Sequence, residues 1–284
     1  MELRLSPLSI NRFKKEVDIN FIKVTSIFGR SSFFNLLSLQ LITHYRSSNM
    51  AISIIVPTYN EECTISDQID YLLKGIEGLS KAEIIIVDGG SSDETTAKAR
   101  SKNVTAVRSP SKGRAAQMNY GASIAKNDIL YFVHADTQPP LTFVDDILES
   151  FTSNYESGCY RYQFKDYPTP LLRINAYCTR FKRIMCRGGD QTLFIKKDLF
   201  NELGGFREDY LIMEDYDFIQ KLMNRKSFRV IQKDAFVSAR KYDHNGYFQV
   251  NFANLVVFMM YFAGASQELM VHAYKNLIYH PKMG

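Results

Sequence analysis

The sequence predicts an α/β fold, a single Rossmann-type domain with a mostly parallel central sheet flanked by helices. From residue 50 onward, strand-like apolar runs alternate with segments of helical spacing, which is typical of parallel strands joined by right-handed crossovers. Three of these runs, Ile52–Val56, Ile84–Val87 and Ile129–Val133, are followed directly by polar or acidic residues. Because ligands bind at the carboxyl ends of strands in open α/β sheets, we expect a binding site along this edge.

The predicted elements follow one another in a regular order after the first strand. Apolar residues at helical spacing predict a helix between the first two strands, and Ser91, Ser92 and Asp93 offer cap oxygens to a helix over residues 94–101. The pattern then predicts a strand over residues 104–107, a helix over 113–125, the strand 129–133, a strand over 160–164, a helix over 171–186, a strand over 192–196 and a helix over 214–224.

Composition and charge exclude several classes of protein. The chain has 284 residues and a net charge of +5, of which residues 1–49 carry +4 and the other 235 residues only +1. A nearly neutral main domain is unlike a nucleic-acid binder. The four cysteines lack C-x-x-C pairing and the five histidines are scattered. We therefore expect free thiols, a reducing cytoplasmic location and no zinc site.

The first 49 residues differ in character from the rest of the chain. They are Ser-rich and mildly basic, and their apolar stretch, residues 33–42, is interrupted by polar residues. That stretch is too short to span a bilayer, which needs about 20 apolar residues. We expect residues 1–49 to be a poorly ordered extension, or Met50 to be the true initiator. The main domain is then predicted over residues 50–243, with a C-terminal helical segment over 244–284.

Residues 245–267 contain no charged side chain. Within them a helical face gathers the side chains of Phe252, Leu255, Val256, Met259 and Ala263. One interpretation is a helix that packs this face on the core. The other is a monotopic surface helix that gives peripheral contact with the inner face of the membrane through residues 246–265.

Acidic residues at the strand ends are the first candidates for a site. Asp88 closes the second strand, and the glycines after it let a ligand approach the backbone. We favour a role in accepting from an N–H of a pyrimidine base over a helix-capping role. Asp136 follows the third strand and offers hard oxygen ligands that suit Mg²⁺ or Mn²⁺. His134 offers a second ligand, a ribose contact or a structural side chain.

Two helix starts add further candidates. Glu214, Asp215 and Asp217 open an amphipathic helix, where acids favour the helix dipole and a rigidly held carboxylate also suits a general base. The sequence leaves both readings open. Residues 112–119 place Arg114 at a second helix start, with Gln117 and Asn119 beyond it, and such groups can hold phosphate. No P-loop or G-x-G-x-x-G is present, which argues against an ATPase or a nicotinamide enzyme.

Taken together, four motifs resemble those of the family 2 glycosyltransferases, which have the GT-A fold. They are residues 57–61, 87–93, 134–136 and 214–215, and the resemblance covers about residues 51–240. Residues 113–119, 134–137, 189–191 and 238–241 are also similar to a bacterial subgroup labelled as arsenosugar-biosynthesis-associated. His134 stands where the family has the first Asp of its D-x-D metal motif.

The resemblance implies roles for these residues. It implies a nucleotide-sugar donor, UDP-linked, a divalent metal (Mn²⁺ or Mg²⁺) on Asp136, and Asp215 as the base that activates an acceptor hydroxyl. The residues that it places around the nucleotide are Pro57, Thr58, Tyr59, Glu61, Asp88, Arg114, His134 and Asp136. The acceptor side is assigned to Asp190, Gln191, Glu214 and Arg240.

The sequence thus predicts an inverting glycosyltransferase, and three rivals bear on it. A sugar-phosphate nucleotidyltransferase would need a Gly-rich basic loop after the first strand, where this chain has Thr58 to Glu61. A catalytically silent nucleotide-binding protein is suggested by His134. The same transfer onto a lipid-phosphate acceptor is suggested by the uncharged helix near the carboxyl end.

Overall fold

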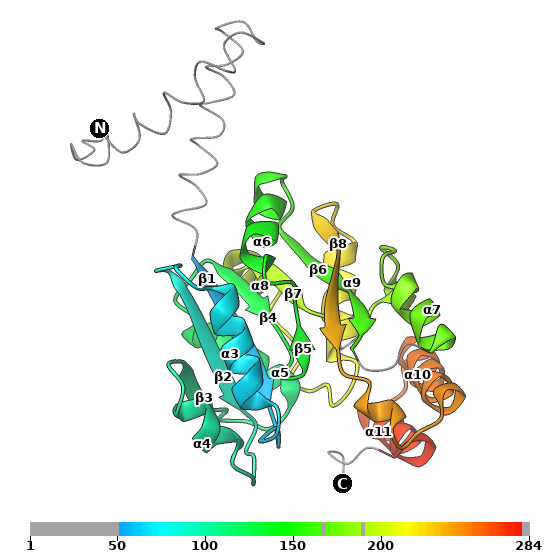
Figure 1. Cartoon of the computed structure of the whole chain (residues 1–284). Helices are drawn as coiled ribbons and strands as arrows, with labels where there is room; N and C mark the ends of the chain where they lie inside the picture. The colour runs from blue at the N-terminus through cyan, green and yellow to red at the C-terminus, as the bar shows by residue number, and fades with distance from the viewer. Residues whose placement is uncertain (1–50, 166–168, 189–190, 280–284) are drawn as a thin grey trace, which may run out of the picture. The chain divides into compact units, whose positions relative to one another are not determined.

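The computed structural model describes residues 51–165, 169–188 and 191–279. The predictions for residues 1–49 and for Met50 as initiator lie outside these residues. The described residues form a curled eight-stranded sheet in the order β3-β2-β1-β4-β7-β6-β8-β5 (Figure 1). Its first half is parallel and consists of β1 (Ile52–Thr58), β2 (Ala82–Asp88), β3 (Thr105–Arg108) and β4 (Ile129–Phe132). The predicted α/β fold with a mostly parallel sheet is confirmed.

Helices cover both faces of this parallel half. Alternate residues of β1 point to opposite faces: Ile54 and Val56 belong to one buried cluster and Ile55 to the other. The first cluster packs under α3 (Ile65–Gly75) and α6 (Phe143–Thr152). The second packs under α5 (Arg114–Ile124), α8 (Lys197–Glu202) and α9 (Glu214–Met223). This burial fixes the register of the strands, and with it the positions of their carboxyl ends.

The second half of the sheet mixes strand directions. β7 (Leu193–Lys196) pairs antiparallel with β4 and with β6 (Ser157–Phe164), and β8 (Phe228–Val237) runs parallel to β6. β5 (Thr137–Gln138) pairs antiparallel with β8. β8 lacks a clean alternation of buried and exposed residues, because the β6–β8 register shifts after Tyr160. The pattern of residues 228–237 therefore did not predict a strand.

The predicted helix over residues 171–186 is too long. α7 runs only from Pro170 to Cys178, and a single 3₁₀ turn follows at Ile184–Cys186. The buried guanidinium of Arg187 donates to the carbonyl oxygens of Thr179 and Phe181. These carbonyls lie just beyond the helix end, and Arg187 satisfies them without further helical turns. The other elements are α4 (Thr95–Arg100), a 3₁₀ turn at Arg240–Tyr242, α10 (Tyr247–Phe262) and α11 (Gln267–Leu277).

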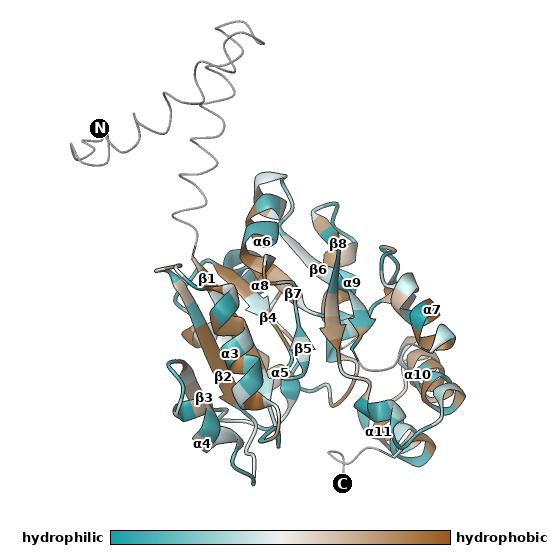
Figure 2. Ribbon diagram, viewed as in Figure 1, coloured by the Kyte–Doolittle hydropathy of each residue, from teal (hydrophilic) through white to brown (hydrophobic). Residues whose placement is uncertain are grey.

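The apolar face predicted for residues 245–267 is not the face that packs on the core. The buried residues of α10 are Val250, Ala253 and Val257. Phe252 and Met259, from the predicted face, are exposed, and apolar residues run along the whole of α10 (Figure 2). α10 is apolar on most of its circumference, so hydrophobic periodicity could not choose the buried side. None of the helices in the described residues is long and apolar enough to cross a membrane.

Candidate functional site

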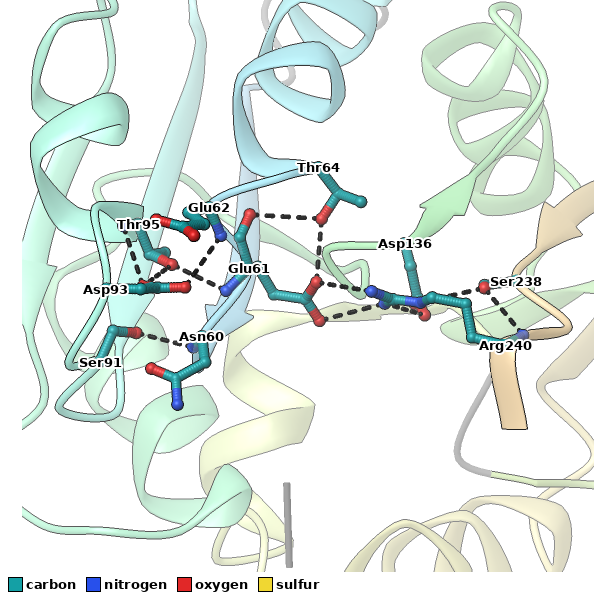
Figure 3. A network of polar contacts seen from close by, with 10 residues as sticks. All are labelled: Asn60, Glu61, Glu62, Thr64, Ser91, Asp93, Thr95, Asp136, Ser238 and Arg240. Atoms are coloured by element: carbon teal, nitrogen blue, oxygen red, sulfur yellow. Dashed lines mark hydrogen bonds and ion pairs between the residues drawn. The ribbon is translucent and has the colours of Figure 1, made fainter. Parts of the chain in front are cut away.

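The polar loops after β1 and β2 are tied to each other at the carboxyl edge of the sheet (Figure 3). The backbone N–H of Glu61 donates to the hydroxyl of Thr95 at 2.7 Å, and the N–H of Glu62 donates to Asp93 at 3.2 Å. Asn60, just before Glu61, has a left-handed φ of 51°, which Asn tolerates better than most residues. These bonds hold the backbone of Glu61 in one place.

Asp88 builds the turn that follows β2. Its Oδ2 accepts from the N–H groups of Gly90 and Ser91 at 2.9 and 3.0 Å, and its Oδ1 accepts from the Ser91 hydroxyl at 2.5 Å. Gly90 has a φ of +96°, which requires glycine for an unstrained turn. Both carboxylate oxygens thus already have donors, and a contact of Asp88 with a base stays a prediction.

Glu61 and Asp136 converge on the guanidinium of Arg240, which lies shortly after β8 (Figure 3). Nη1 and Nη2 of Arg240 each lie 3.2 Å from an oxygen of Glu61, and Nη2 lies 2.9 Å from Oδ2 of Asp136. The hydroxyl of Thr64 also donates to Oε2 of Glu61 at 2.9 Å. Burial disfavours the charged guanidinium, but its hydrogen bonds to Glu61 and Asp136 outweigh this and raise the pKa of Arg240 above its ordinary value.

This arrangement fits a cation. Two carboxylates from separate strand ends face one positive group, and carboxylate oxygens are the ligands that Mg²⁺ and Mn²⁺ prefer. Such ions often take only one or two carboxylates and complete their shell with water and substrate phosphate. Within the described part of the chain, no group of three or more His, Cys, Asp or Glu residues gathers into an all-protein metal site. His134 is half-buried, and its carbonyl oxygen accepts from the side chain of Gln68 at 3.4 Å.

Asp215, at the start of α9, is held by a second arginine, Arg114, which is the first residue of α5. Nη2 of Arg114 lies 2.7 Å from Oδ2 of Asp215, and Nε of the same residue lies 2.5 Å from Oε1 of Glu214. Glu214 and Asp215 are both largely buried. Met213, directly before them, has a left-handed φ of 68°, an unfavourable conformation for a side chain of this kind. Met213 packs against Val257 of α10 and Met270 of α11, so these helices stabilise the strained turn.

The start of α5 connects the two acidic groups. Gln117, one turn after Arg114, donates to the carbonyl oxygens of Thr58 and Val87, both at 2.7 Å. α5 thus binds Asp215 through Arg114 and, one helical turn later, the ends of β1 and β2 through Gln117. The predicted phosphate-holding role of Gln117 is wrong, because it is buried with its amide N–H groups engaged by these carbonyls. The side-chain amide of Asn119 likewise bonds the backbone of Phe206: it donates to the carbonyl oxygen and accepts from the N–H.

The remaining predicted residues have diverse surroundings. Pro57 and Thr58 are buried within β1, and the Thr58 hydroxyl donates to the carbonyl of Val87 at 3.4 Å. Tyr59 is exposed, with 43% of the residue's surface accessible to solvent. Gln191 is buried, and its amide donates to the carbonyl of Tyr160 at 3.5 Å. Asp190 lies outside the described residues.

Arg240 is the site residue whose position the sequence did not predict. We expected it on the acceptor side, but it lies with the two acids of the predicted nucleotide and metal side. It is 179 residues from Glu61 in the chain, so no local spacing relates the two. The signal that could have found it is its place just beyond a strand, yet β8 itself was missed.

Comparisons with known proteins bear on the family and the fold of the chain. The family model described as Glycosyl transferase family 2 matches residues 53–231. An uncharacterized glycosyltransferase of Haemophilus influenzae is 28% identical over 193 residues, which cover 62% of this chain and 63% of that protein. The aligned part is thus less than two thirds of that relative's length.

Two solved structures share the fold. The mannosyltransferase PcManGT from Pyrobaculum calidifontis, in complex with GDP-Man and Mn²⁺, has a TM-score of 0.56 at 20% identity and covers 85% of this chain and 78% of its own. Residues 1–349 of S. aureus TarS, in complex with UDP-GlcNAc, give a TM-score of 0.55 at 18% identity, covering 80% and 71%. At these identities the likeness shows the fold alone, which is that of GT-A glycosyltransferases.

Proposed function

We propose that this chain, which belongs to glycosyl transferase family 2, moves a sugar from a nucleotide-diphosphate sugar to an acceptor hydroxyl with inversion at the anomeric carbon. The observation that carries the proposal is the convergence of Glu61 and Asp136, from the ends of neighbouring parallel strands, on one cation. A site of this charge at the carboxyl edge of the sheet suits a nucleoside diphosphate with a divalent ion. TarS was solved with UDP-GlcNAc and PcManGT with GDP-Man, and of these two donor types we propose the UDP-linked one that the sequence resemblance implies.

On the donor side, the chain's own residues supply the shape and the negative charge. Gly90 gives the turn after β2 its positive φ, and Tyr59, directly after β1, is exposed. Asp136, with Glu61, would hold the metal. When bound, Mn²⁺ or Mg²⁺ stabilises the charge that grows on the departing diphosphate.

On the acceptor side, Asp215 would act as the general base. Its ion pair with Arg114, at 2.7 Å, holds the carboxylate in one place. The acceptor hydroxyl would give its proton to Asp215, and its oxygen would attack the anomeric carbon from the face opposite to the leaving diphosphate. Arg114 would hold the base in position rather than hold the phosphates, since it already donates to both acids.

A thermal-shift screen of nucleotide sugars, with and without Mn²⁺, tests the donor. A ligand that binds the folded state raises its apparent stability by mass action. We expect the largest shift with a UDP-sugar plus Mn²⁺, followed by slow release of free sugar by transfer to water. A shift without any release, under conditions where related enzymes hydrolyse their donors, would favour the catalytically silent nucleotide-binding protein. No shift with any nucleotide sugar would contradict the proposal.

A lipid-phosphate acceptor is a second candidate, and one surface favours it. α7 and α10 contact each other through Asn175 and Asn251. Exposed apolar side chains line both helices: Ile174, Tyr177, Phe248, Phe252, Leu255 and Met259. Residues 169–188 add four arginines and lysines that are at least partly exposed, Arg173, Arg180, Lys182 and Arg183, and no acid. An apolar surface beside a basic segment suits an anionic bilayer. We therefore propose a cytoplasmic protein in peripheral contact with the inner face of the membrane.

Vesicle sedimentation tests this surface. We expect binding to vesicles that contain phosphatidylglycerol, weaker binding to pure phosphatidylcholine, and loss of binding in the Phe252→Ser, Met259→Ser double variant. Leu79→Ser, at an exposed apolar residue of the loop after α3, is the matched control. Equal recovery in the supernatant with every vesicle would remove the membrane proposal and leave sugar transfer standing.

The likeness to the arsenosugar-associated subgroup stays a prediction about substrate.

A further inference from the structure

We propose that Arg240 is an internal cation that competes with a divalent metal for the carboxylates of Glu61 and Asp136. The inference rests on the metal assignment within the proposed function and adds the residue that must leave before the metal can use both acids. In the free protein, Arg240 neutralises the site. When a metal enters, Arg240 is displaced.

Each of the three nitrogens of the Arg240 guanidinium has at least one partner. Its two terminal nitrogens bind both oxygens of Glu61, one of them also binds Asp136, and its Nε lies 3.2 Å from the hydroxyl oxygen of Ser238 (Figure 3). Paired hydrogen bonds between a guanidinium and a carboxylate are among the stronger polar contacts in proteins. A metal ion that takes ligands from both acids uses oxygens that Arg240 now uses, so the two cations exclude each other.

The two sides of this contact differ in how firmly they are held. Glu61 has a side chain only 9% exposed, fixed by Thr64 and by the bonded loop after β1. The Arg240 side chain is 47% exposed and belongs to a single 3₁₀ turn, residues 240–242, after β8. Displacement therefore moves the arginine rather than Glu61, which stays in place to receive the metal.

A released guanidinium beside a bound metal would lie close to the donor's diphosphate. Guanidinium groups pair readily with phosphate oxygens, so the diphosphate would give Arg240 a new partner. Metal and nucleotide would then bind cooperatively, each favouring the state in which Arg240 has left the acids. The free protein, by contrast, would bind metal weakly.

Titration of Mn²⁺ into nucleotide-free protein, followed by electron paramagnetic resonance, tests the competition directly. The set comprises the wild type, Arg240→Gln, Asp136→Asn and the double variant, with Arg229→Gln as control. Arg229 lies on β8 and forms an ion pair with Glu149, so this control removes one positive charge away from the site. Circular dichroism and thermal melting check that each variant folds, and Arg240→Lys, which keeps the charge but loses the fork, covers a failure of the Gln variant.

We expect Arg240→Gln to bind Mn²⁺ at least about tenfold more tightly than the wild type, because a charge-assisted contact no longer opposes the metal. Arg240→Lys should gain about threefold, and Arg229→Gln should match the wild type. Asp136→Asn should abolish the site in either background. Unchanged or weaker Mn²⁺ binding in Arg240→Gln, with binding still lost in Asp136→Asn, overturns the competition and leaves the metal assignment intact. If Mn²⁺ binding is unaffected by Asp136→Asn in both backgrounds, the competition and the metal assignment are both overturned. Sugar transfer is then still tested by the nucleotide-sugar screen.

Discussion

Two clusters in this molecule have the same composition and different construction. In each, two carboxylates share one arginine: Glu61 and Asp136 with Arg240, and Glu214 and Asp215 with Arg114. In the second, the acids are neighbours in one helical turn, and Arg114 is the first residue of the 11-residue helix α5. In the first, the acids follow different strands, and the arginine comes from a short turn. We infer from the comparison that the cluster with Arg114, our proposed base side, is held more rigidly than the cluster with Arg240, our proposed metal side.

The largest expected effect comes from removing the base in the fixed cluster. Asp215→Asn should lower the rate of sugar transfer by about 10²–10⁴-fold, because the amide cannot accept the acceptor's proton. Donor binding should remain nearly unchanged. Steady-state kinetics together with calorimetry of UDP binding measure both quantities. Asp217→Asn is the matched control, since Asp217 lies in the same helical turn and forms an ion pair with Lys221. Full activity in Asp215→Asn would refute its role.

Removing the arginine of the fixed cluster should act on both stability and rate. Arg114→Met leaves two largely buried carboxylates without this partner and should lower the free energy of unfolding by about 2 kcal/mol. The transfer rate should fall by about tenfold or more, with little change in the donor KM. Urea denaturation and kinetics provide the measurements. A change in donor KM alone would mean that Arg114 binds the diphosphate, as the sequence first indicated.

A smaller effect is expected from loosening the loop that carries Glu61. Desolvation disfavours the charged form of Asp93 and by itself would raise the pKa. The hydrogen bonds that Asp93 accepts from Thr95 and Glu62 outweigh desolvation, so the pKa of Asp93 is lowered. A lowered pKa stabilises the fold above the unfolded-state value of about 4, and this contribution is lost as the pH falls through the folded-state value. Asp93→Ala should thus cost about 1 kcal/mol at pH 7 and less below pH 4. A cost that grows on acidification, measured by urea denaturation at each pH, would contradict this assignment.

The smallest expected effect comes from the support of Arg240. The hydroxyl oxygen of Ser238 accepts from the backbone N–H and from Nε of Arg240, both at 3.2 Å. Ser238→Ala should change the free energy of unfolding by less than about 0.5 kcal/mol and strengthen Mn²⁺ binding by about twofold. Mn²⁺ titration and urea denaturation check the two values. Weaker Mn²⁺ binding would indicate that Ser238 helps the metal rather than the arginine.

The same contrast explains what the sequence could predict. The parallel strands, the helices between them and the polar residues at their ends follow from periodicity, because β1, β2 and β4 are buried on both faces. Asp136 and the acidic pair of α9 were found in this way. These are local signals, which one segment of the chain carries by itself.

Contacts between distant segments were not predictable in the same way. The bond of Arg240 to Glu61 depends on β8, whose alternation is interrupted by the register shift after Tyr160. The structural use of Gln117 depends on two carbonyls from separate strands. The buried face of α10 is the one that packs against α11 and the turn at Met213, and the apolar pattern of α10 does not single it out. In each case contacts between segments that are distant in the chain decided the outcome, and no local pattern carries that information.

The most direct test of the proposed donor site at this sheet edge is calorimetric titration of UDP, with Mn²⁺ present, into the wild type and Asp136→Asn. We predict that UDP binds the wild type and that its affinity falls at least about tenfold in the variant, because the metal then loses its ligand and the diphosphate its counter-ion. Equal affinity in the two proteins, or no binding of UDP to either, would contradict the assignment of this edge as the donor site.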